Sequence, residues 1–158
     1  TLADVINAGC RDGELDVRGV SHRGYFASIT DFKSYHDANM DLIDYKTATD
    51  LFHDNWPIYT RTNNSCPTHY FDTANVSNSV ISNGSMIEGT VENSIVGRGC
   101  TIKKGAVIKN CVVLADCTIG ENVHIENLVV DKHAKITHAK EIIRPADEPG
   151  YIKRNDTL

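Results

Sequence analysis

The sequence predicts a mainly β protein whose residues 71–143 wind into a parallel β-helix of about four coils. Three observations predict this fold. Aliphatic residues recur at steps of 6, 6 and 5, blocks with the same pattern repeat in tandem, and asparagines and cysteines return once per block. Residues 1–45 show helix and strand patterns instead, residues 46–70 are typical of a linker, and residues 144–158 form a tail without the repeat.

The repeat is clearest in three consecutive blocks of equal length at 92–108, 109–125 and 126–142, and residues 77–91 follow the same pattern in a slightly shorter form. An α-helix places apolar residues at steps of 3 and 4, so this spacing excludes a helix. Three short strands per coil, each directing one aliphatic side chain into a shared core, explain the spacing. The predicted core residues are Ile81, Ile87, Val91, Val96, Ile102, Ile108, Val113, Ile119, Ile125, Val130, Ile136 and Ile142.

Stacked coils place each residue over its counterpart in the preceding block, at a strand spacing of about 4.8 Å. Ile119 is then expected to lie between Ile102 and Ile136. Burying such a side chain contributes about 1.5–3 kcal/mol before chain entropy is counted. A single coil could not bury its own core, so neighbouring coils are expected to share their stability.

Two further columns of residues support the register. Asparagine tolerates left-handed backbone angles, which suit the corner of a coil, and stacked amides can hydrogen-bond from coil to coil. Cys100 and Cys117 occupy the same place in successive blocks and are expected to be buried, stacked thiols without a catalytic role. The corner asparagines are Asn78, Asn93, Asn110 and Asn127.

The elements before the β-helix are expected in the following order. Aliphatic residues near the start indicate a helix, which Gly9 is expected to end. Residues 14–20 and 23–29 are typical of two strands joined by a turn. Asp31 is a candidate N-cap for a helix with one face formed by Phe32, Tyr35, Asn39 and Leu42.

These elements are too few to form an independent core, so they are interpreted as the tail of a larger α+β domain. The predicted linker contains Trp56 followed by Pro57, which favours an extended backbone. The chain begins with Thr1 rather than methionine, which indicates a processed form or an excised piece. The tail at 144–158 is expected to cap the last coil.

Composition excludes several classes of function. The net charge of −5 argues against a nucleic-acid partner, because neutralising phosphates needs a basic face. No apolar run approaches the roughly 20 residues of a membrane helix, and the first residues do not form a signal peptide. The five cysteines are odd in number and lack a CxxC pair, so we expect a cytoplasmic protein with neither disulfides nor a structural zinc site.

Several motifs resemble one known family. The residues Gly24-Tyr25-Phe26, Ser34-Tyr35, Ala38-Asn39-Met40-Asp41-Leu42 and Trp56-Pro57-Ile58-Tyr59-Thr60 are similar to a passage of glucose-1-phosphate adenylyltransferases (ADP-glucose pyrophosphorylases). In that family a nucleotidyltransferase domain leads through this passage into a left-handed β-helix of hexapeptide repeats. The resemblance therefore implies the left hand, which the spacing alone does not fix.

The same passage departs from the catalytic members of the family, which read GYWRDVGT. The family's Trp, Arg and metal-binding Asp correspond to Phe26, Ala27 and Ser28. Nucleotidyl transfer depends on a divalent ion held by carboxylates, and a serine hydroxyl supplies no negative charge. The Gly-rich nucleotide loop is also absent. We therefore expect no catalytic residue, cofactor or metal in this chain, and Mg²⁺ with ATP only on a catalytic partner.

This combination resembles the non-catalytic, GlgD-type regulatory subunits of bacterial glycogen synthesis. The resemblance implies either pairing with a catalytic glucose-1-phosphate adenylyltransferase subunit in a heterotetramer or self-association. It also implies a sugar-phosphate effector bound by basic residues. The candidates by charge are Arg61, Arg144, Lys153 and Arg154, none of which the sequence assigns to a site.

Two other functions are built on the same kind of repeat. A hexapeptide-repeat acyltransferase needs a histidine base, usually on a loop extruded from the coil, and the repeat carries His124, His133 and His138 without such an insertion. A zinc site between subunits could use His133 and His138, but a third ligand is expected where Gly97 and Arg98 stand. Exposed turn histidines are the favoured interpretation.

Overall fold

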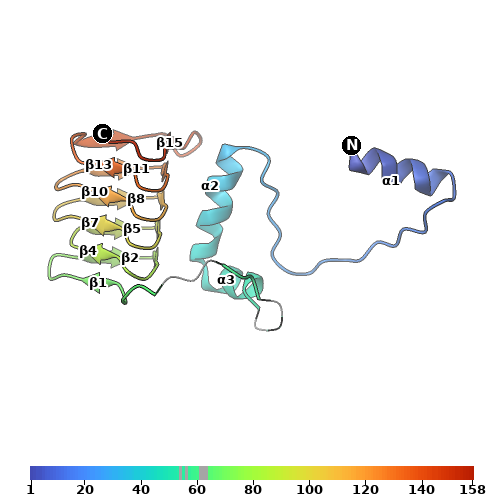
Figure 1. The fold of residues 1–158 in the computed structure, drawn as a ribbon, viewed down its shortest axis with the longest axis horizontal. Coiled ribbons are helices and arrows are strands. Elements are labelled where there is room, and N and C mark those ends of the chain that lie inside the picture. The colour runs from blue at the N-terminus through green and yellow to red at the C-terminus, as the bar shows by residue number, and fades with distance from the viewer. Residues whose placement is uncertain (54, 56, 61–63) are drawn as a thin grey trace.

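The computed structural model describes residues 1–53, 55, 57–60 and 64–158, and its β-helix is a stack of coils with three flat sides (Figure 1). Each side is a parallel sheet of five short strands, and consecutive strands along the chain pass from one side to the next. The predicted mainly β fold with about four coils is confirmed. Its parallel coils agree with the left-handed hexapeptide type that the resemblance implied.

Sheet 1 contains β1 (His69–Tyr70), β4 (Met86–Ile87), β7 (Thr101–Ile102), β10 (Thr118–Ile119) and β13 (Lys135–Ile136). Sheet 2 contains β2 (Asn75–Ser77), β5 (Thr90–Glu92), β8 (Val107–Lys109), β11 (His124–Glu126) and β14 (Glu141–Ile143). Sheet 3 contains β3 (Val80–Ile81), β6 (Ile95–Val96), β9 (Val112–Val113), β12 (Leu128–Val130) and β15 (Gly150–Ile152).

The strand register follows the predicted repeat. Ile119 pairs with Ile102 on one side and with Ile136 on the other, so each partner comes from the adjacent block. The shorter coil is also confirmed, because Val76 pairs with Val91 and the residues between them complete one coil. Three successive steps of 6, 6 and 5 residues therefore return the chain to the same side of the β-helix after one coil.

The core is the column of aliphatic side chains between the three sheets. Ten of the twelve predicted core residues are buried, with exposed fractions of 0%. The other two, Ile81 and Ile142, lie near the ends of the stack and are partly buried against it. Cys100 and Cys117 are buried in the same column, as expected.

The asparagine column occupies the same corner in four successive coils. Asn78, Asn93, Asn110 and Asn127 have φ values of 41°, 45°, 49° and 55°. The amide of Asn78 donates to Oδ1 of Asn93 at 2.8 Å, and the amide of Asn93 donates to Oδ1 of Asn110 at 2.7 Å. Asn127 instead donates to the carbonyl of Arg144 at 2.6 Å, because the tail begins above it.

Helix α2 (Phe32–Met40) covers the outer face of sheet 3, and its N-cap is Asp31, as predicted. Val112 and Val129 point outward from sheet 3, yet each is only 1% exposed. A nine-residue helix rises by about 13 Å, which matches nearly three coil spacings of about 4.8 Å. The 3₁₀ helix η1 (Asp41–Ile43) and helix α3 (Tyr45–Leu51) continue from its end.

Helix α1 (Leu2–Arg11) runs past Gly9, so the predicted end of this helix is wrong. Its true end is marked by Gly13, which has φ of 74°. The N–H of Glu14 reaches the carbonyl of Gly9 at 2.9 Å, and the N–H of Gly13 reaches that of Cys10 at 3.3 Å. These two bonds form a Schellman motif, and a glycine one turn earlier is tolerated inside the helix.

The two strands predicted at 14–20 and 23–29 are also wrong, because both segments lack regular structure. A strand is stable when a neighbour accepts and donates its backbone hydrogen bonds. In the described part of the chain these segments have no such neighbour. Their apolar side chains, including Val20 and Ile29, are exposed.

Two further expectations need correction. Helix α3 extends into the predicted linker, and Asp44, just before that linker, caps the helix by accepting from the N–H of Thr47 at 2.8 Å. The tail does more than cap the last coil, because β15 pairs with β12 and adds a fifth strand to sheet 3. Trp56 lies outside the described residues. No helix in the described ranges is long and apolar enough to cross a membrane.

A basic corner pocket as the candidate functional site

The corner between sheet 3 and sheet 1 holds a cavity of about 620 Å³, called the corner pocket below. Its charged and titratable lining residues are Arg98, Asp116, Lys132, His133 and Arg154. Among the described residues that line it, three carry a permanent positive charge and one carries a negative charge. The pocket is therefore locally basic in a chain whose net charge is −5.

The coil register builds the pocket. Arg98, Ala115 and Lys132 occupy the same place in successive coils and stack at one corner position. The next residue of two of these coils, Asp116 and His133, has a left-handed backbone with φ of 62° and 63°. This turn directs the chain from sheet 3 to sheet 1. Arg154 joins from the tail, just after the end of β15.

These side chains can bind an anion. The Nη2 of Arg98 lies 3.5 Å from Oγ1 of Thr60, and Nδ1 of His133 lies 3.7 Å from Oδ2 of Asp116. Guanidinium and ammonium groups form charge-assisted hydrogen bonds with phosphate and carboxylate oxygens. The arrangement suits a small molecule that carries phosphate groups better than it suits a cation.

A second layer of contacts supports the rim of the pocket. The hydroxyl of Tyr151 donates to Oδ2 of Asp131 at 2.7 Å, and the backbone N–H of Lys132 donates to Oδ1 of the same carboxylate at 2.7 Å. The hydrogen bond from Tyr151 holds the pKa of Asp131 below its usual value, and the nearby charges of Arg154 and Lys132 add to this. The ring of Tyr151 meets the ring of Phe32 edge-on at 5.7 Å.

The four effector candidates do not form one cluster. Arg154 lines the corner pocket, whereas Arg144 lines a separate pocket of about 280 Å³. Lys153 is exposed, and its backbone N–H donates to Oδ2 of Asp156 at 3.2 Å. Arg61 lies outside the described residues.

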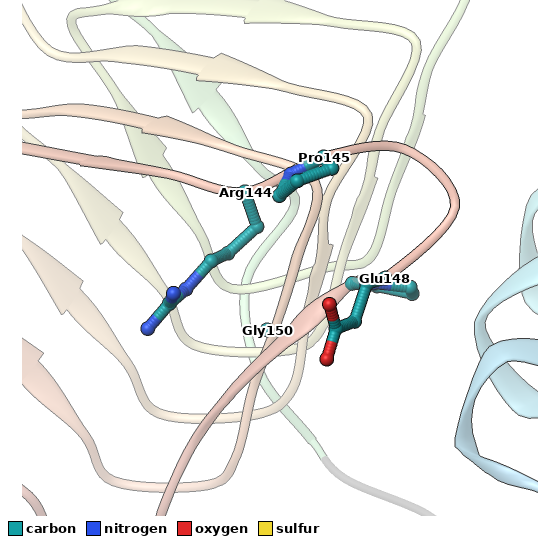
Figure 2. A pocket seen from close by; sticks show the side chains of 5 residues that line it. Arg144, Pro145, Glu148 and Gly150 are labelled. Atoms are coloured by element: carbon teal, nitrogen blue, oxygen red, sulfur yellow. The ribbon is translucent and has the colours of Figure 1, made fainter.

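The smaller pocket lies in the connection from β14 to β15 (Figure 2). Arg144 and Glu148 flank it from opposite sides of Gly150, so its two charges have opposite sign. Prolines 145 and 149 complete its wall. A pocket of this size with balanced charge is a weaker candidate for binding a phosphate than the corner pocket.

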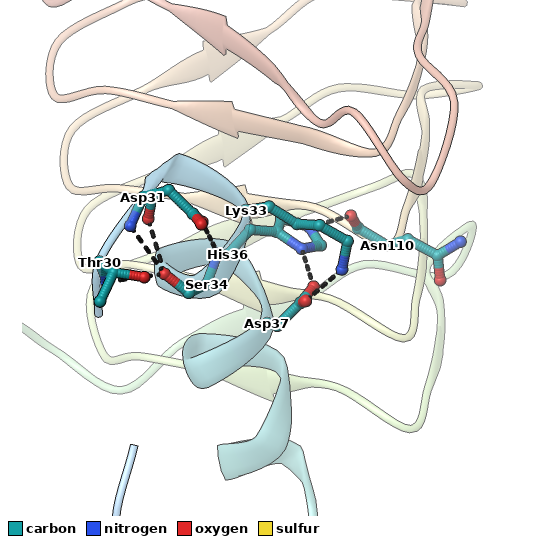
Figure 3. A network of polar contacts seen from close by, with 7 residues as sticks. All are labelled: Thr30, Asp31, Lys33, Ser34, His36, Asp37 and Asn110. Carbon is teal, nitrogen blue, oxygen red and sulfur yellow. Dashed lines mark hydrogen bonds and ion pairs between the residues drawn. The ribbon is translucent and has the colours of Figure 1, made fainter. Parts of the chain in front are cut away.

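A polar network joins helix α2 to the β-helix (Figure 3). Nε2 of the buried His36 lies 2.9 Å from the carbonyl oxygen of Asn110, and Nδ1 lies 3.4 Å from Oδ1 of Asp37. Asp37 also pairs with Lys33, and this hydrogen bond is the main cause that lowers the pKa of Asp37. Asn110 and the pocket-lining Asp116 belong to the same coil, on either side of β9.

The passage that differs from catalytic relatives lies before α2. Phe26, Ala27 and Ser28 are in a segment without regular structure, and Phe26 is 79% exposed. Tyr25 ties the passage to the helix region, since its hydroxyl donates to Oδ2 of Asp41 at 3.0 Å. The three positions carry no carboxylate.

The histidines of the repeat do not support the two alternative functions. His133 lines the corner pocket, but His138 is exposed on the next side of the coil, where its backbone N–H donates to the carbonyl of Leu158. In the described ranges no group of three His, Cys, Asp or Glu residues is placed to hold a metal ion. Between residues 75 and 143, all of them described, the strands follow one another without an inserted loop, so the acyltransferase alternative is not favoured.

Sequence reasoning missed most of the corner pocket. The register of the repeat could have found it, because it stacks Arg98 and Lys132 at one corner. Arg154 was a candidate by its charge alone, but the sequence could not place it or Tyr151 at this corner, because the tail does not follow the repeat.

Comparison with known proteins gives a consistent result. A family model described as GlmU-like, C-terminal hexapeptide matches residues 67–148. The chain is 36% identical over 140 residues to the glycogen biosynthesis protein GlgD of Bacillus subtilis. This match covers 89% of this chain and 41% of that protein.

Two glucose-1-phosphate adenylyltransferases are also similar. The protein of Geobacillus stearothermophilus is 42% identical over 86 residues, covering 54% of this chain and 22% of that protein. The protein of Bacillus mycoides is 36% identical over 122 residues, covering 77% of this chain and 32% of that protein. The chain spans less than half the length of each of these relatives.

Proposed function

The chain belongs to the GlmU-like, C-terminal hexapeptide family, and on that premise we propose that it is the regulatory and assembly portion of a glucose-1-phosphate adenylyltransferase-type subunit in glycogen biosynthesis. Its relatives are glucose-1-phosphate adenylyltransferases and GlgD. The observation that carries the proposal is the similarity to GlgD over 89% of the chain. A match of 140 residues in a chain of 158 includes α2 and most of the β-helix.

The regulatory part of the proposal is supported by Phe26, Ala27 and Ser28. A divalent ion that neutralises the phosphates of a nucleotide needs carboxylate ligands, and this passage offers none. We therefore assign the formation of ADP-glucose from glucose 1-phosphate and ATP, together with Mg²⁺, to a catalytic partner subunit. The β-helix would serve as a rigid surface for assembly.

The exposed apolar side chains before α2 support contact with further protein. Leu15, Val17 and Phe26 are 46%, 57% and 79% exposed along the segment that lacks regular structure. Large apolar side chains exposed in this way favour burial against a folded surface. The rest of the larger α+β domain to which this segment is assigned is the first surface that could bury them; for assembly, a catalytic subunit is the proposed partner, and a second copy of this protein is the alternative.

We assign the corner pocket to a phosphate-bearing effector, of which a sugar phosphate is the expected class. Its support is the basic lining by Arg98, Lys132 and Arg154. Binding there would stabilise one arrangement of the coil corner, and β9 connects that corner directly to the carbonyl that faces His36. An effector can shift activity only as far as it binds two states with different affinity.

The proposal is tested with the full-length protein and a catalytic homologue expressed together. We expect co-purification as a mixed oligomer, no ADP-glucose synthesis by the full-length protein alone, and altered rate or effector response of the catalytic subunit in the complex. A full-length protein that makes ADP-glucose alone at a rate near that of the catalytic homologue would refute the regulatory role.

The effector pocket is tested separately by neutralising its cations. The double variant Lys132→Gln/Arg154→Gln should assemble normally and lose the effector response. The matched control is Lys103→Gln/Lys140→Gln, which removes two exposed positive charges outside the pocket. An equal loss of response in both double variants would point to net charge rather than to the pocket.

A further inference from the structure

Asp131 is a carboxylate beside the basic corner pocket, and both of its oxygens already have donors. Tyr151 donates to Oδ2 through its hydroxyl, and Lys132 donates to Oδ1 through its backbone N–H. The same Lys132 lines the pocket, as does Arg154 from the end of the tail. A negative charge at this point can compete with a bound phosphate for the two cations.

We propose that Tyr151 is a positioning residue that fixes the orientation of Asp131 beside the cations of the corner pocket, limits how strongly this carboxylate competes for them, and thereby sets the affinity of the pocket for phosphate groups. This inference rests on the proposed role of the pocket as a phosphate site. Without the hydroxyl, Oδ2 of Asp131 loses its donor and the carboxylate rotates toward the nearest positive charges. Asp131 then competes more strongly with phosphate for Lys132 and Arg154, and phosphate binds more weakly.

Phe32 extends this arrangement to helix α2. Its ring lies edge-on to the ring of Tyr151, with centroids 5.7 Å apart and planes at 73°. Edge-to-face contacts fix the orientation of both rings, so the first turn of α2 restrains the direction of the Tyr151 hydroxyl. The affinity of the pocket therefore depends on whether α2 is docked on sheet 3, although no residue of α2 lines the pocket in the described part of the chain.

The test measures binding of inorganic pyrophosphate to the chain by titration calorimetry. Tyr151→Phe keeps the ring contact and removes only the hydroxyl, and it should weaken binding about two- to fivefold, the range of partly exposed charge interactions. Asp131→Asn removes the competing charge and should tighten binding by a similar factor. In the Asp131→Asn background, Tyr151→Phe should change the affinity by less than about 1.5-fold.

Two variants complete the set. Phe32→Leu should weaken binding about twofold, and only while Asp131 is present. Tyr45→Phe is the matched control, because Tyr45 is 82% exposed and lies outside the pocket. It should leave the affinity unchanged. Circular dichroism of each variant separates these effects from loss of the fold.

The outcomes distinguish this inference from the proposed function. If the wild-type chain does not bind pyrophosphate, the corner pocket is not a phosphate site, and both its assignment to an effector and this inference fail, whereas the assembly role is decided by its own test. If it binds and Tyr151→Phe has no effect, or has the same effect with and without Asp131, the pocket stands and the role of Tyr151 is overturned. The inference is supported if Tyr151→Phe weakens pyrophosphate binding, Asp131→Asn tightens it, and Tyr151→Phe has almost no effect in the Asp131→Asn background.

Discussion

At the level of single residues, the corners of the β-helix show why asparagine recurs in this sequence. A corner needs a left-handed backbone, which a β-branched or bulky residue adopts only with strain. Asparagine accepts that backbone, and its amide also bonds to the next coil, as in the chain from Asn78 through Asn93 to Asn110. One residue type thus meets two requirements.

Substitution of Asn93 separates the two requirements. Asn93→Ala should lower the free energy of unfolding by about 2–3 kcal/mol, because it strains the backbone at φ of 45° and removes both amide bonds. Asn93→Gly keeps an easy left-handed backbone and loses only the bonds, so its effect should be smaller by about 1 kcal/mol. Urea denaturation of the three proteins measures this, and equal effects would show that the backbone angle contributes nothing.

The cysteines give a second prediction at this scale. Cys100, Cys111 and Cys117 are buried, with their thiols bonded to backbone carbonyls such as that of Leu114, whereas Cys10 and Cys66 are exposed. Burial raises the pKa of Cys111 to about 12, so almost no reactive thiolate forms at neutral pH.

A thiol-specific reagent should therefore modify two cysteines rapidly in the native protein and all five in denaturant. The variant Cys10→Ser/Cys66→Ser is the control and should show no rapid phase. A third cysteine that reacts in the rapid phase would contradict the buried column.

At the level of elements, the contact between α2 and sheet 3 depends on one buried polar side chain. His36 is the only buried residue among the described helices, and its Nε2 lies 2.9 Å from the carbonyl oxygen of Asn110. The carbonyl belongs to Asn110, whose side chain already accepts a hydrogen bond from Asn93 in the asparagine column. A buried carbonyl without a donor is unfavourable, so the helix supplies what the coil lacks.

His36→Ala should lower the free energy of unfolding by about 1–3 kcal/mol, since it leaves the Asn110 carbonyl without its donor. The amides of α2 should also exchange with solvent faster, while those of the β-helix should keep their protection. Lys33→Ala is the control, because Lys33 and its partner Asp37 are both 47% exposed, and such pairs contribute little. Similar effects of the two variants would mean that His36 does not anchor the helix.

The elements also show what the sequence could and could not predict. The coil register and the cap at Asp31 followed from local patterns, and both are confirmed. The strands at 14–20 and 23–29 were wrong because a period of two identifies a segment suited to a sheet without identifying a neighbour for it. The repeat stacks Arg98 and Lys132 at one corner of the pocket, but it could not place Arg154, which lines the pocket, or Tyr151, which supports the rim through Asp131, because both belong to a tail with no repeat.

At the level of the whole molecule, stability is expected to be nearly a sum over coils. Each coil contacts mainly the coils above and below it, as the pairing of β7 with β4 and β10 shows. A repeat protein of this kind resembles a one-dimensional array, in which units can be removed if the remaining faces still match. The paired core residues Val91 and Ile108 are one full coil apart, so the chain between them defines such a unit.

Deletion of residues 92–108 joins Val91 to Lys109 and should leave every remaining side of the helix in register. We expect the shortened chain to keep a cooperative unfolding transition and the circular dichroism of a β-helix, with a lower free energy of unfolding. Asn110 and Tyr151 remain above the deletion, so the contacts with His36 and Phe32 should persist.

Deletion of residues 97–108 is the control for the full-coil deletion, because it removes two sides of a coil rather than three. The shorter deletion places core residues opposite the wrong sheet, and burial of the aliphatic column then fails above the junction. It should therefore abolish the cooperative transition, which urea denaturation of both shortened chains measures. A full-coil deletion that unfolds as readily as this control would show that the coils are not interchangeable units.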